Sequence, residues 1–423
     1  MSHTGYRILH TSDWHLGNSL HDHSRIDEYR SFFAELKKII VLNEVDALLV
    51  SGDIFDSGAP SNAALELYYS FLTSLNGSCC KNVVVTAGNH DSPATLNTSR
   101  ALLELLNVRV VATPDAANQF KNEVFALPNE EDPQVIVCAA PFLRDASLQA
   151  SLDNEKFETD EQFVRLGTRA HFAKLQKLAL ELREKLGKNL PIVAMAHLYA
   201  AGAAPSENAD DTEYSIVGNL ENIGSEIFPP VFDYVALGHI HRPQKVAGED
   251  RIRYSGSPLP MGFDEARLQS EVLIVDLEQG NSPVVRSIGL NLPRKLVTIS
   301  GTDLSEIRAK IAVQDKDTPG AWVRVQFTGV GSVGSLRQNL AADFERTSLE
   351  LVQAEYVARV DNSQATLDEE KDLSEFSPTE VFERRLESVE SKMGFDQDLE
   401  LKTRVEQAFQ EILKSVQEGV VDE

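Results

Sequence analysis

Over roughly its first 240 residues the chain alternates between short β-branched apolar runs and longer segments with apolar residues at helical spacing. Such runs predict buried strands, and the helical spacing predicts amphipathic helices. Strands are predicted at residues 6–9, 47–50, 83–85, 135–138, 192–195 and 234–237. Helices bounded by Gly, Pro, Ser or Asn are predicted at residues 25–42, 62–75, 95–106 and 160–186. The alternation is typical of an α/β domain.

A second unit begins near Leu292, where the pattern changes to strand, helix, strand, helix, strand. Its predicted elements are residues 295–299, 304–312, 322–327, 333–344 and 349–357. Beyond Val360 the sequence turns polar and acidic, with apolar residues too sparse to close an independent core. We therefore expect a large domain at 1–290, a small α/β capping domain at 291–360, and a linker with a helical tail at 361–423.

The tail contains two predicted amphipathic helices. Ser377, Pro378 and Glu380 form a helix-start signature, with a serine cap, a proline in the first turn and an acid after it. Two apolar stripes follow, separated by Gly394: Phe382, Leu386, Val389 and Met393, then Leu401, Val405, Phe409, Ile412 and Val416. Such stripes usually pack on their own protein. Because an acidic linker leads to this pair, docking on another chain is the favoured interpretation.

The composition of the chain indicates the cellular compartment. Apolar residues make up 42% of the chain, and no run approaches the roughly 18 consecutive apolar residues needed to cross a bilayer. The N-terminus is short and polar, without the apolar region of a secretory signal. The three cysteines, Cys79, Cys80 and Cys138, are too few and too poorly spaced for a disulfide framework. We expect a cytoplasmic protein.

The formal net charge of −25 argues against a free-standing DNA-binding protein, because nonspecific DNA affinity comes from Lys and Arg at phosphates. Residues 361–423 hold a disproportionate share of this charge, with 18 acidic and 7 basic residues. The objection is weaker for the rest of the chain but still applies. A partner that supplies a basic surface would remove it.

Residues suited to metal binding follow the apolar runs directly. They are Asp13 and His15, then Asp53, then Asn89, His90 and Asp91, then His197, and finally His239 and His241. Singly, each has an ordinary explanation, such as a turn acid, a left-handed asparagine or a hydrogen-bonded histidine. Together they match the needs of a binuclear centre at the carboxyl ends of strands, where ligands bind in open α/β sheets.

The donor types also restrict the metal. Imidazole combined with carboxylate favours manganese, iron or zinc over magnesium, which prefers oxygen ligands and keeps its waters. No cysteine accompanies these residues, so the mark of a structural zinc site is missing. Glycines before Asp53, Asn89 and His239 relieve strain in turns and allow the backbone to approach a phosphate closely.

Five motifs carry a family resemblance. The runs DWHLG, GDIFDSG, AGNHDS, AHLYA and LGHIHRP, in this order over residues 13–243, resemble the signature of calcineurin-like metallophosphoesterases. The segments TSDWHLG, GNHDSPATLNTSRALLELLN, YSGSPLPMGF and SPTEVFERRL further resemble the SbcD family, the nuclease subunits of bacterial SbcCD complexes. The implied fold is a calcineurin-like α/β β-sandwich flanked by helices, with a small α/β cap and a C-terminal partner-binding tail.

The resemblance also implies a division of roles in the site. Asp13, His15, Asp53 and His241 would hold one metal, and Asp53, Asn89, His197 and His239 the second, so Asp53 would bridge. His90 would contact the scissile phosphate and help to protonate the leaving oxygen, and Asp91 would orient His90. In some relatives a histidine stands where this chain has Asp56, so no second catalytic imidazole is assigned there.

The function that the resemblance implies is hydrolysis of DNA phosphodiesters by water activated between two divalent metals, with Mn2+ as the implied ion. The family acts as a double-strand exonuclease and a single-strand or hairpin endonuclease in DNA repair, recombination and replication. The implied partners are DNA, a second copy of this chain through helices 62–75 and 95–106, and two SbcC-like ATPase chains held by the tail. A small-molecule or phosphoprotein metallophosphatase is the alternative, and a metal-free scaffold is disfavoured because no ligand is missing.

Arginines that could contact phosphate are scattered along the chain. Candidates are Arg25, Arg30, Arg100, Arg144 and Arg242, of which Arg242 follows the implied ligand His241. Ordinary surface charge explains the first four equally well, so they remain open.

Overall fold

The computed structural model describes residues 5–152, 157–200, 224–328 and 333–357. Its large domain contains two six-stranded sheets. In order, the first sheet consists of β14 (Val284–Gly289), β13 (Glu271–Leu277), β1 (Tyr6–Thr11), β4 (Ala47–Ser51), β5 (Asn82–Thr86) and β6 (Val108–Val111). The second consists of β11 (Gln244–Val246), β12 (Glu249–Tyr254), β10 (Tyr234–Gly238), β9 (Ile192–His197), β8 (Val135–Ala139) and β7 (Val124–Leu127).

Neighbouring strands at the centre of each sheet run parallel. In the first sheet β1, β4, β5 and β6 pair in parallel, and in the second sheet β8, β9, β10 and β12 do so. Parallel strands are usually buried on both faces, which explains their continuous apolar runs. Because parallel strands end at one edge, the residues after them gather there.

The two sheets pack face to face through a shared apolar layer. Ile8, Leu49 and Val84 of the first sheet meet Val193 and Met195 of the second in one buried cluster. This layer fixes how the two sheets sit against each other, and therefore how closely the ends of their strands approach.

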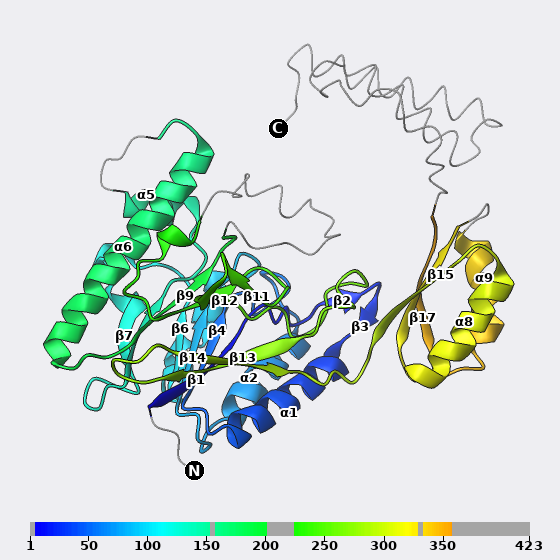
Figure 1. The fold of residues 1–423 in the computed structure, drawn as a ribbon, viewed down its shortest axis with the longest axis horizontal. Coiled ribbons are helices and arrows are strands. Elements are labelled where there is room, and N and C mark those ends of the chain that lie inside the picture. Colours follow the sequence, from blue (N-terminus) through cyan, green and yellow to red (C-terminus); the bar gives the residue numbers. More distant parts are fainter. Residues whose placement is uncertain (1–4, 153–156, 201–223, 329–332, 358–423) are drawn as a thin grey trace.

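Helices cover the two outer faces. In Figure 1, α1 (Ile26–Leu42) and α2 (Asn62–Ser74) lie against the first sheet and α6 (Asp160–Leu186) against the second, with α5 (Asp145–Ser151) packed beside α6. Thr159 caps α6 by accepting from the backbone N–H of Gln162, and Gly187 ends it in the left-handed conformation. Short 3-10 turns occur at Ala116–Asn118, Lys121–Glu123 and Ser225–Ile227.

The prediction of one continuous helix at 95–106 is wrong. The structure has two short helices there, α3 (Pro93–Thr98) and α4 (Arg100–Glu104). Ser92 caps the first with its side chain, and Pro93 occupies the first turn. The break is at Ser99, whose hydroxyl accepts a hydrogen bond from Tyr69 of α2 at 2.9 Å. This contact ties the junction between the two helices to α2.

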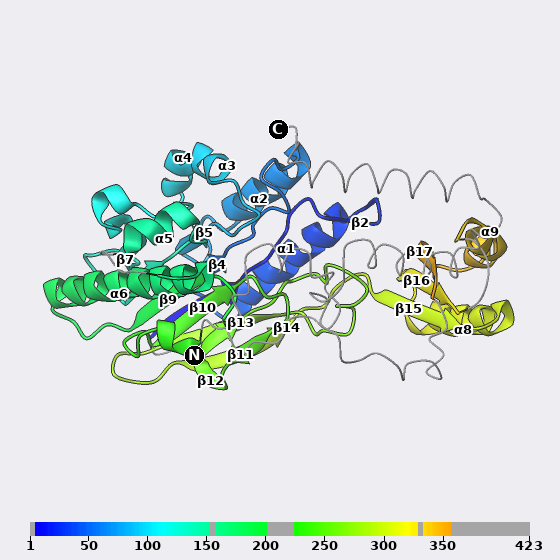
Figure 2. The same ribbon diagram turned by 90° about the horizontal axis from the view of Figure 1, so that it is seen from above.

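The cap is a separate small domain (Figure 2). Its sheet has the order β15 (Leu296–Gly301), β16 (Trp322–Phe327) and β17 (Glu350–Tyr356), all parallel. Helices α8 (Leu304–Asp317) and α9 (Val333–Phe344) pack on it through a buried apolar cluster. Asp303 caps α8 by accepting from the N–H groups of Ser305 and Glu306. The βαβαβ pattern predicted from residue 295 onward is confirmed.

The cap contacts the large domain beside a small hairpin of β2 (Ser19–Leu20) and β3 (His23–Ser24), visible at the junction in Figure 1. Leu20 and Phe263 of the large domain form one apolar cluster with Leu296, Trp322 and Val352 of the cap. The cap is therefore docked through a specific contact.

The six strands and the helices at 25–42, 62–75 and 160–186 predicted for the large domain are found within a few residues of their expected positions. The remaining described strands of the large domain were not predicted; they are β2, β3, β6, β7, β11, β12, β13 and β14. The tail helices predicted after Ser377 lie outside the described residues. Within the described ranges, no helix is both long and apolar enough to span a membrane.

Candidate metal centre

The predicted donors all follow the carboxyl ends of central strands. Asp13 and His15 follow β1, Asp53 follows β4, and Asn89 follows β5 in the first sheet. From the second sheet, His197 ends β9, and His239 and His241 follow β10. The structure brings these donors from both sheets together at one end of the sandwich.

Backbone conformation at this edge is unusual. Asp13, His15, Asp53 and His239 all have positive φ angles, of 52°, 47°, 49° and 102°. Non-glycine residues rarely adopt this region, and such strain clusters at functional sites. Hydrogen bonds hold these turns: the N–H of Asp13 donates to the carbonyl of Gly52 at 3.0 Å, and the N–H of His239 donates to the Asp13 carboxylate at 2.8 Å.

Two glycines leave room for the donors. A Cβ at Gly88 would lie 2.0 Å from Oδ1 of Asp53, and a Cβ at Gly52 would lie 2.1 Å from Nδ1 of His197. Any other residue would push the donor aside. The glycines predicted to relieve strain therefore have a second role, which is to let the backbone approach the donors.

A first donor cluster consists of Asp13, His15 and His241, whose ligand atoms lie within 4.8 Å of one another. Nε2 of His15 and Nε2 of His241 are 3.2 Å apart. Two neutral imidazole nitrogens that both present lone pairs at this distance repel, so this pair needs a proton or a cation between them.

A second cluster consists of Asp53, His197 and His239, again within 4.8 Å. The side-chain oxygen of Asn89 lies 3.0 Å from Nε2 of His197 and 3.1 Å from Nδ1 of His239. Oδ2 of Asp53 lies 3.2 Å from Nε2 of His197 and 3.6 Å from Nε2 of His15. Asp53 therefore stands between the two clusters, in the position of a bridging carboxylate.

Three of the imidazoles have a second nitrogen beside an oxygen acceptor. Nδ1 of His197 lies 2.9 Å from the carbonyl oxygen of Ser51, and Nδ1 of His241 lies 3.0 Å from the carboxylate of Glu265. Nδ1 of His15 lies 3.4 Å from the carboxylate of Asp56. The hydrogen bonds of His197 and His241 fix the tautomer and aim the other nitrogen at the donor clusters, whereas the longer contact of His15 acts through charge alone.

Glu265 and Asp56 were not among the predicted site residues. Asp56 lies inside the GDIFDSG motif, and Glu265 lies just after YSGSPLPMGF. Their closeness to these motifs was the one sequence signal that could have identified them as site residues. Neither residue follows a strand directly, which is why a search at strand ends does not find them.

The role predicted for Asp91 is corrected by the structure. Its buried carboxylate accepts from the N–H groups of Gly88, Ile54 and Phe55. Nδ1 of His90 instead lies 3.2 Å from the carbonyl oxygen of Asp56. Asp91 therefore holds the two loops that carry Asp53 and Asn89, and a backbone carbonyl orients His90.

Burial and charge shift the pKa values of the donors in opposite directions. Burial alone would lower the pKa of His197, but the charge of Asp53 raises it to about 9. His241 is partly buried, and Glu265 raises its pKa to about 9. Burial and the neighbouring His197 lower the pKa of His239 to about 3. Despite burial, the charges of His197, His15 and His90 hold the pKa of Asp53 below its usual range.

The carboxyl of Asp91 differs from that of Asp53. Burial and the charge of Asp53 raise its pKa to about 6, although three backbone N–H groups favour the ionised form. The two buried carboxyls therefore differ in function. Only Asp53, which faces imidazoles, is suited to bind a cation.

This donor set fits two divalent cations. Each cluster combines carboxylate with imidazole, the ligand type suited to manganese, iron or zinc. Two imidazole nitrogens only 3.2 Å apart and a carboxylate facing both clusters are the arrangement that a pair of cations would stabilise.

Comparisons with known proteins point to the same family that the sequence motifs resemble. Residues 6–243 match the calcineurin-like phosphoesterase family, and residues 292–390 match the type 5 capsule protein repressor C-terminal domain. The SbcD subunit of the SbcCD nuclease of Escherichia coli is 33% identical over 384 residues, 90% of this chain and 92% of that protein. The chain belongs to the SbcD family.

Other SbcD family members agree. The SbcD proteins of Rhodobacter capsulatus and Bacillus subtilis are 34% and 32% identical over 73% and 76% of this chain, and over 75% and 78% of their own. Among solved structures, a β-glucosidase of Thermotoga maritima aligns with a TM-score of 0.23 and 11% identity over 85% of this chain and 89% of its own. That score is too low to indicate a common fold.

The candidate arginines differ in their surroundings within this SbcD family fold. Arg25 is buried and donates to the carbonyl of Pro260 at 2.6 Å, so this candidate is not available to a phosphate. Arg30 and Arg100 pair with acids on their own helices. Arg144 donates to the carbonyls of Asn89 and Asp91 beside the centre.

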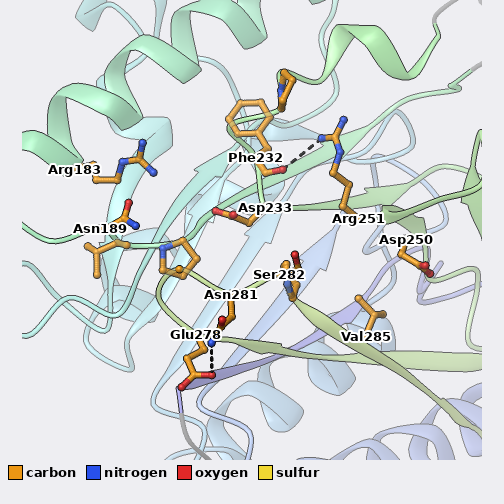
Figure 3. A pocket seen from close by; sticks show the side chains of 15 residues that line it. Arg183, Asn189, Phe232, Asp233, Asp250, Arg251, Glu278, Asn281, Ser282 and Val285 are labelled. Atoms are coloured by element: carbon orange, nitrogen blue, oxygen red, sulfur yellow. Dashed lines mark hydrogen bonds between the residues drawn. The ribbon is translucent and has the colours of Figure 1, made fainter.

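A hollow of about 480 Å³ lies away from the centre (Figure 3). It is lined by Pro191 and Asp233, which precede β9 and β10, whereas the donors follow the opposite ends of these strands. Arg251 on its wall donates to the carbonyl of Phe232 at 3.4 Å. The hollow therefore does not belong to the metal centre.

Replacement of Gly88 tests whether Asp53 is a metal ligand. We expect Gly88→Ala to weaken Mn2+ binding by about 10- to 100-fold, because the new Cβ displaces the Asp53 carboxylate. The matched control is Gly334→Ala in α9 of the cap, where a Cβ also meets nothing within 4 Å. Calorimetric titration of the metal-free protein gives both affinities, and equal affinities would contradict a role for Asp53 in the site.

Proton release tests the shifted histidines. Because the pKa values of His197 and His241 are both about 9 in the metal-free protein, both rings are charged at pH 7. Metal ligation requires neutral imidazole, so Mn2+ binding should release roughly two protons at pH 7, and affinity should rise toward pH 9. Titration in buffers of different ionisation enthalpy measures the release; binding without proton release would contradict these protonation states.

The same shifts set the pH dependence of metal-free stability. A folded-state pKa above the ordinary value of 6.5 contributes stability that is fully present below that value. This contribution is lost as the pH rises through about 9. Metal binding and stabilisation of the metal-free protein by these two rings therefore have opposite pH dependence.

Proposed function

We propose that the protein is a metal-dependent DNA nuclease that hydrolyses phosphodiester bonds with water. The observation that carries the proposal is the pair of donor clusters joined at Asp53, with His90 at their edge. The relatives, which are named as SbcD subunits of the SbcCD nuclease, supply the substrate class. We assign Asp13, His15, Asp53 and His241 to one metal and Asp53, Asn89, His197 and His239 to the other, with Mn2+ as the physiological ion.

When bound, two divalent cations lower the pKa of a water and stabilise charge on the attacking and leaving oxygens. The chain contributes orientation and proton transfer. His90 is partly exposed, and its Nδ1 faces the carbonyl of Asp56. This contact fixes the ring so that its other nitrogen can face the scissile phosphate and donate a proton to the leaving oxygen.

A basic pocket beside the centre fits a polymeric substrate. It has a volume of about 650 Å³, lies between the large domain and the cap, and is lined by Arg242, Arg267 and Arg324, the last of which pairs with Asp264. Arg242 follows the ligand His241 directly. We assign this pocket to the phosphate of a nucleotide that flanks the cut, a contact that a small monoester cannot make.

A homodimer of this chain is part of the proposal. Leu102 and Leu105, at α4, are 68% and 80% exposed, and exposed apolar residues at one place indicate an interaction surface. They fall within the segment 95–106 that, with 62–75, is expected to form the dimer contact. Two SbcC-like ATPase chains would complete a two-plus-two assembly by binding the tail, and would supply the basic DNA surface that this acidic chain lacks.

The cellular setting is inferred from chemistry. The three cysteines are free, and Cys80 and Cys138 are buried, which fits the reducing cytoplasm. There the assembly would act on double-strand ends and hairpins during DNA repair, recombination and replication.

Cleavage of end-labelled duplex and hairpin DNA tests the function. We expect Mn2+-dependent cleavage that increases with the ATPase partner, and a loss of about 100- to 10,000-fold in His90→Gln, because the leaving oxygen then lacks its proton donor. Lys177→Ala, an exposed change on α6, is the control and should cleave like the wild type. No DNA cleavage, together with rapid hydrolysis of a chromogenic monoester, would favour the metallophosphatase instead.

A further inference from the structure

One turn, residues 261–265, connects the cap to the metal centre. The N–H of Glu265 donates to the carbonyl of Gly262 at 3.2 Å, which closes the turn. Phe263 of this turn packs in the apolar cluster shared with the cap. Because the turn is closed and its aromatic ring is buried, its residues move together.

The cap holds this turn through Arg324 of β16. The guanidinium of Arg324 donates to the carboxylate of Asp264 at 2.9 Å and lies 5.2 Å from the centre of the Phe263 ring. The Arg324 side chain is 14% exposed, so this ion pair is less screened than one at the surface. Nε of Arg324 donates to Thr298 within the cap at 3.2 Å, which fixes the guanidinium.

The next residue of the turn faces the metal centre. Glu265 is nearly buried; one carboxylate oxygen lies 3.0 Å from Nδ1 of His241 and the other accepts from the N–H of Met261 at 2.7 Å. This contact sets the ring of His241 so that its Nε2 faces the first donor cluster. Asp264 therefore faces the cap, and its neighbour Glu265 faces the metal ligand His241.

The second contact of the cap reaches the same donor cluster. His23 of the β2–β3 hairpin lies 2.9 Å from the carboxylate of Glu350 in β17. That carboxylate also accepts from Nε1 of Trp322 at 2.7 Å, and the ring of Trp322 lies 5.3 Å from that of His23. The hairpin is therefore tied to the cap sheet.

The hairpin begins just after His15. The N–H of Asn18 donates to the carbonyl of His15 at 3.0 Å, and the amide of Asn18 donates to the carboxylate of Asp56 at 3.0 Å. Asp56 in turn lies 3.4 Å from Nδ1 of His15. Both cap contacts thus lead to the two imidazoles whose nitrogens face each other at 3.2 Å.

The second cluster is held differently. Nδ1 of His197 faces the carbonyl of Ser51, the last residue of the buried strand β4. The side-chain oxygen of Asn89 lies between His197 and His239. These contacts are made by residues at the ends of strands in the two sheets. Movement of the cap therefore does not act directly on the positions of His197 and His239.

We infer that Arg324 of the cap is a positioning residue for the metal held by Asp13, His15 and His241, acting through Asp264 and Glu265. Docking of the cap sets the affinity of this metal site and leaves the site of His197 and His239 unchanged. The inference rests on the two-metal centre of the proposed function and adds a regulatory input to one of its metals.

Calorimetric titration of Mn2+ into the metal-free full chain tests the inference. Wild type should show two binding events. In Arg324→Ala one affinity should fall by about tenfold, the lower end expected for loss of an outer contact, and the other should stay within about twofold. Arg324→Lys, which keeps the charge but loses the planar fork, should be intermediate.

The control is Arg308→Ala. Arg308 pairs with Asp343 at 2.8 Å within the cap, so it matches the charge and pairing of Arg324 without touching the turn. A double variant, Arg324→Ala with Asp264→Ala, should bind no more weakly than either single variant, because both changes break the same connection.

Several outcomes separate the possibilities. A selective loss at one site that Arg308→Ala does not reproduce supports the inference. Equal loss at both sites, or wild-type binding by Arg324→Ala, overturns it while leaving the two-metal centre intact. A wild type that binds no Mn2+ instead overturns the proposed function itself.

Discussion

Asp53 is a nearly buried carboxylate with imidazoles of two donor clusters around it, and the arrangement of the centre depends on this placement. A carboxylate that loses its water must be compensated by opposite charge, and the two histidine clusters or the cations they bind provide that charge. The position exists only because Gly88 has no side chain and because the backbone of Asp53 adopts a positive φ. Packing, backbone strain and electrostatics therefore all act on one residue.

The two sheets contribute different donor groups to the metal centre. The first sheet supplies carboxylates, the amide of Asn89 and one imidazole, and the second sheet supplies three imidazoles. The apolar layer between the sheets holds these groups at binding distance, so stability of the core and integrity of the centre are linked. The cap adds a further contact, through Arg324 and the turn that carries Glu265, to one side of the centre.

Much of this could be predicted from the sequence because parallel strands leave a clear signal. Continuous apolar runs followed by Asp, Asn or His mark each donor in the sequence, and the apolar spacing of residues 160–186 predicted the bounds of α6. Asp56 and Glu265 were missed because their roles depend on distances across the chain. The role of Asp91 was wrong because a neighbour in sequence was assumed to be a neighbour in hydrogen bonding, whereas its carboxylate meets three backbone N–H groups.

The most direct test of the account is the position of the metals. A crystal of the protein soaked in Mn2+ and measured near the manganese absorption edge should give two anomalous peaks, one beside His15 and His241 and one beside His197 and His239, with the Asp53 carboxylate between them. A single peak, or two peaks without Asp53 between them, would contradict the bridging role on which the account depends.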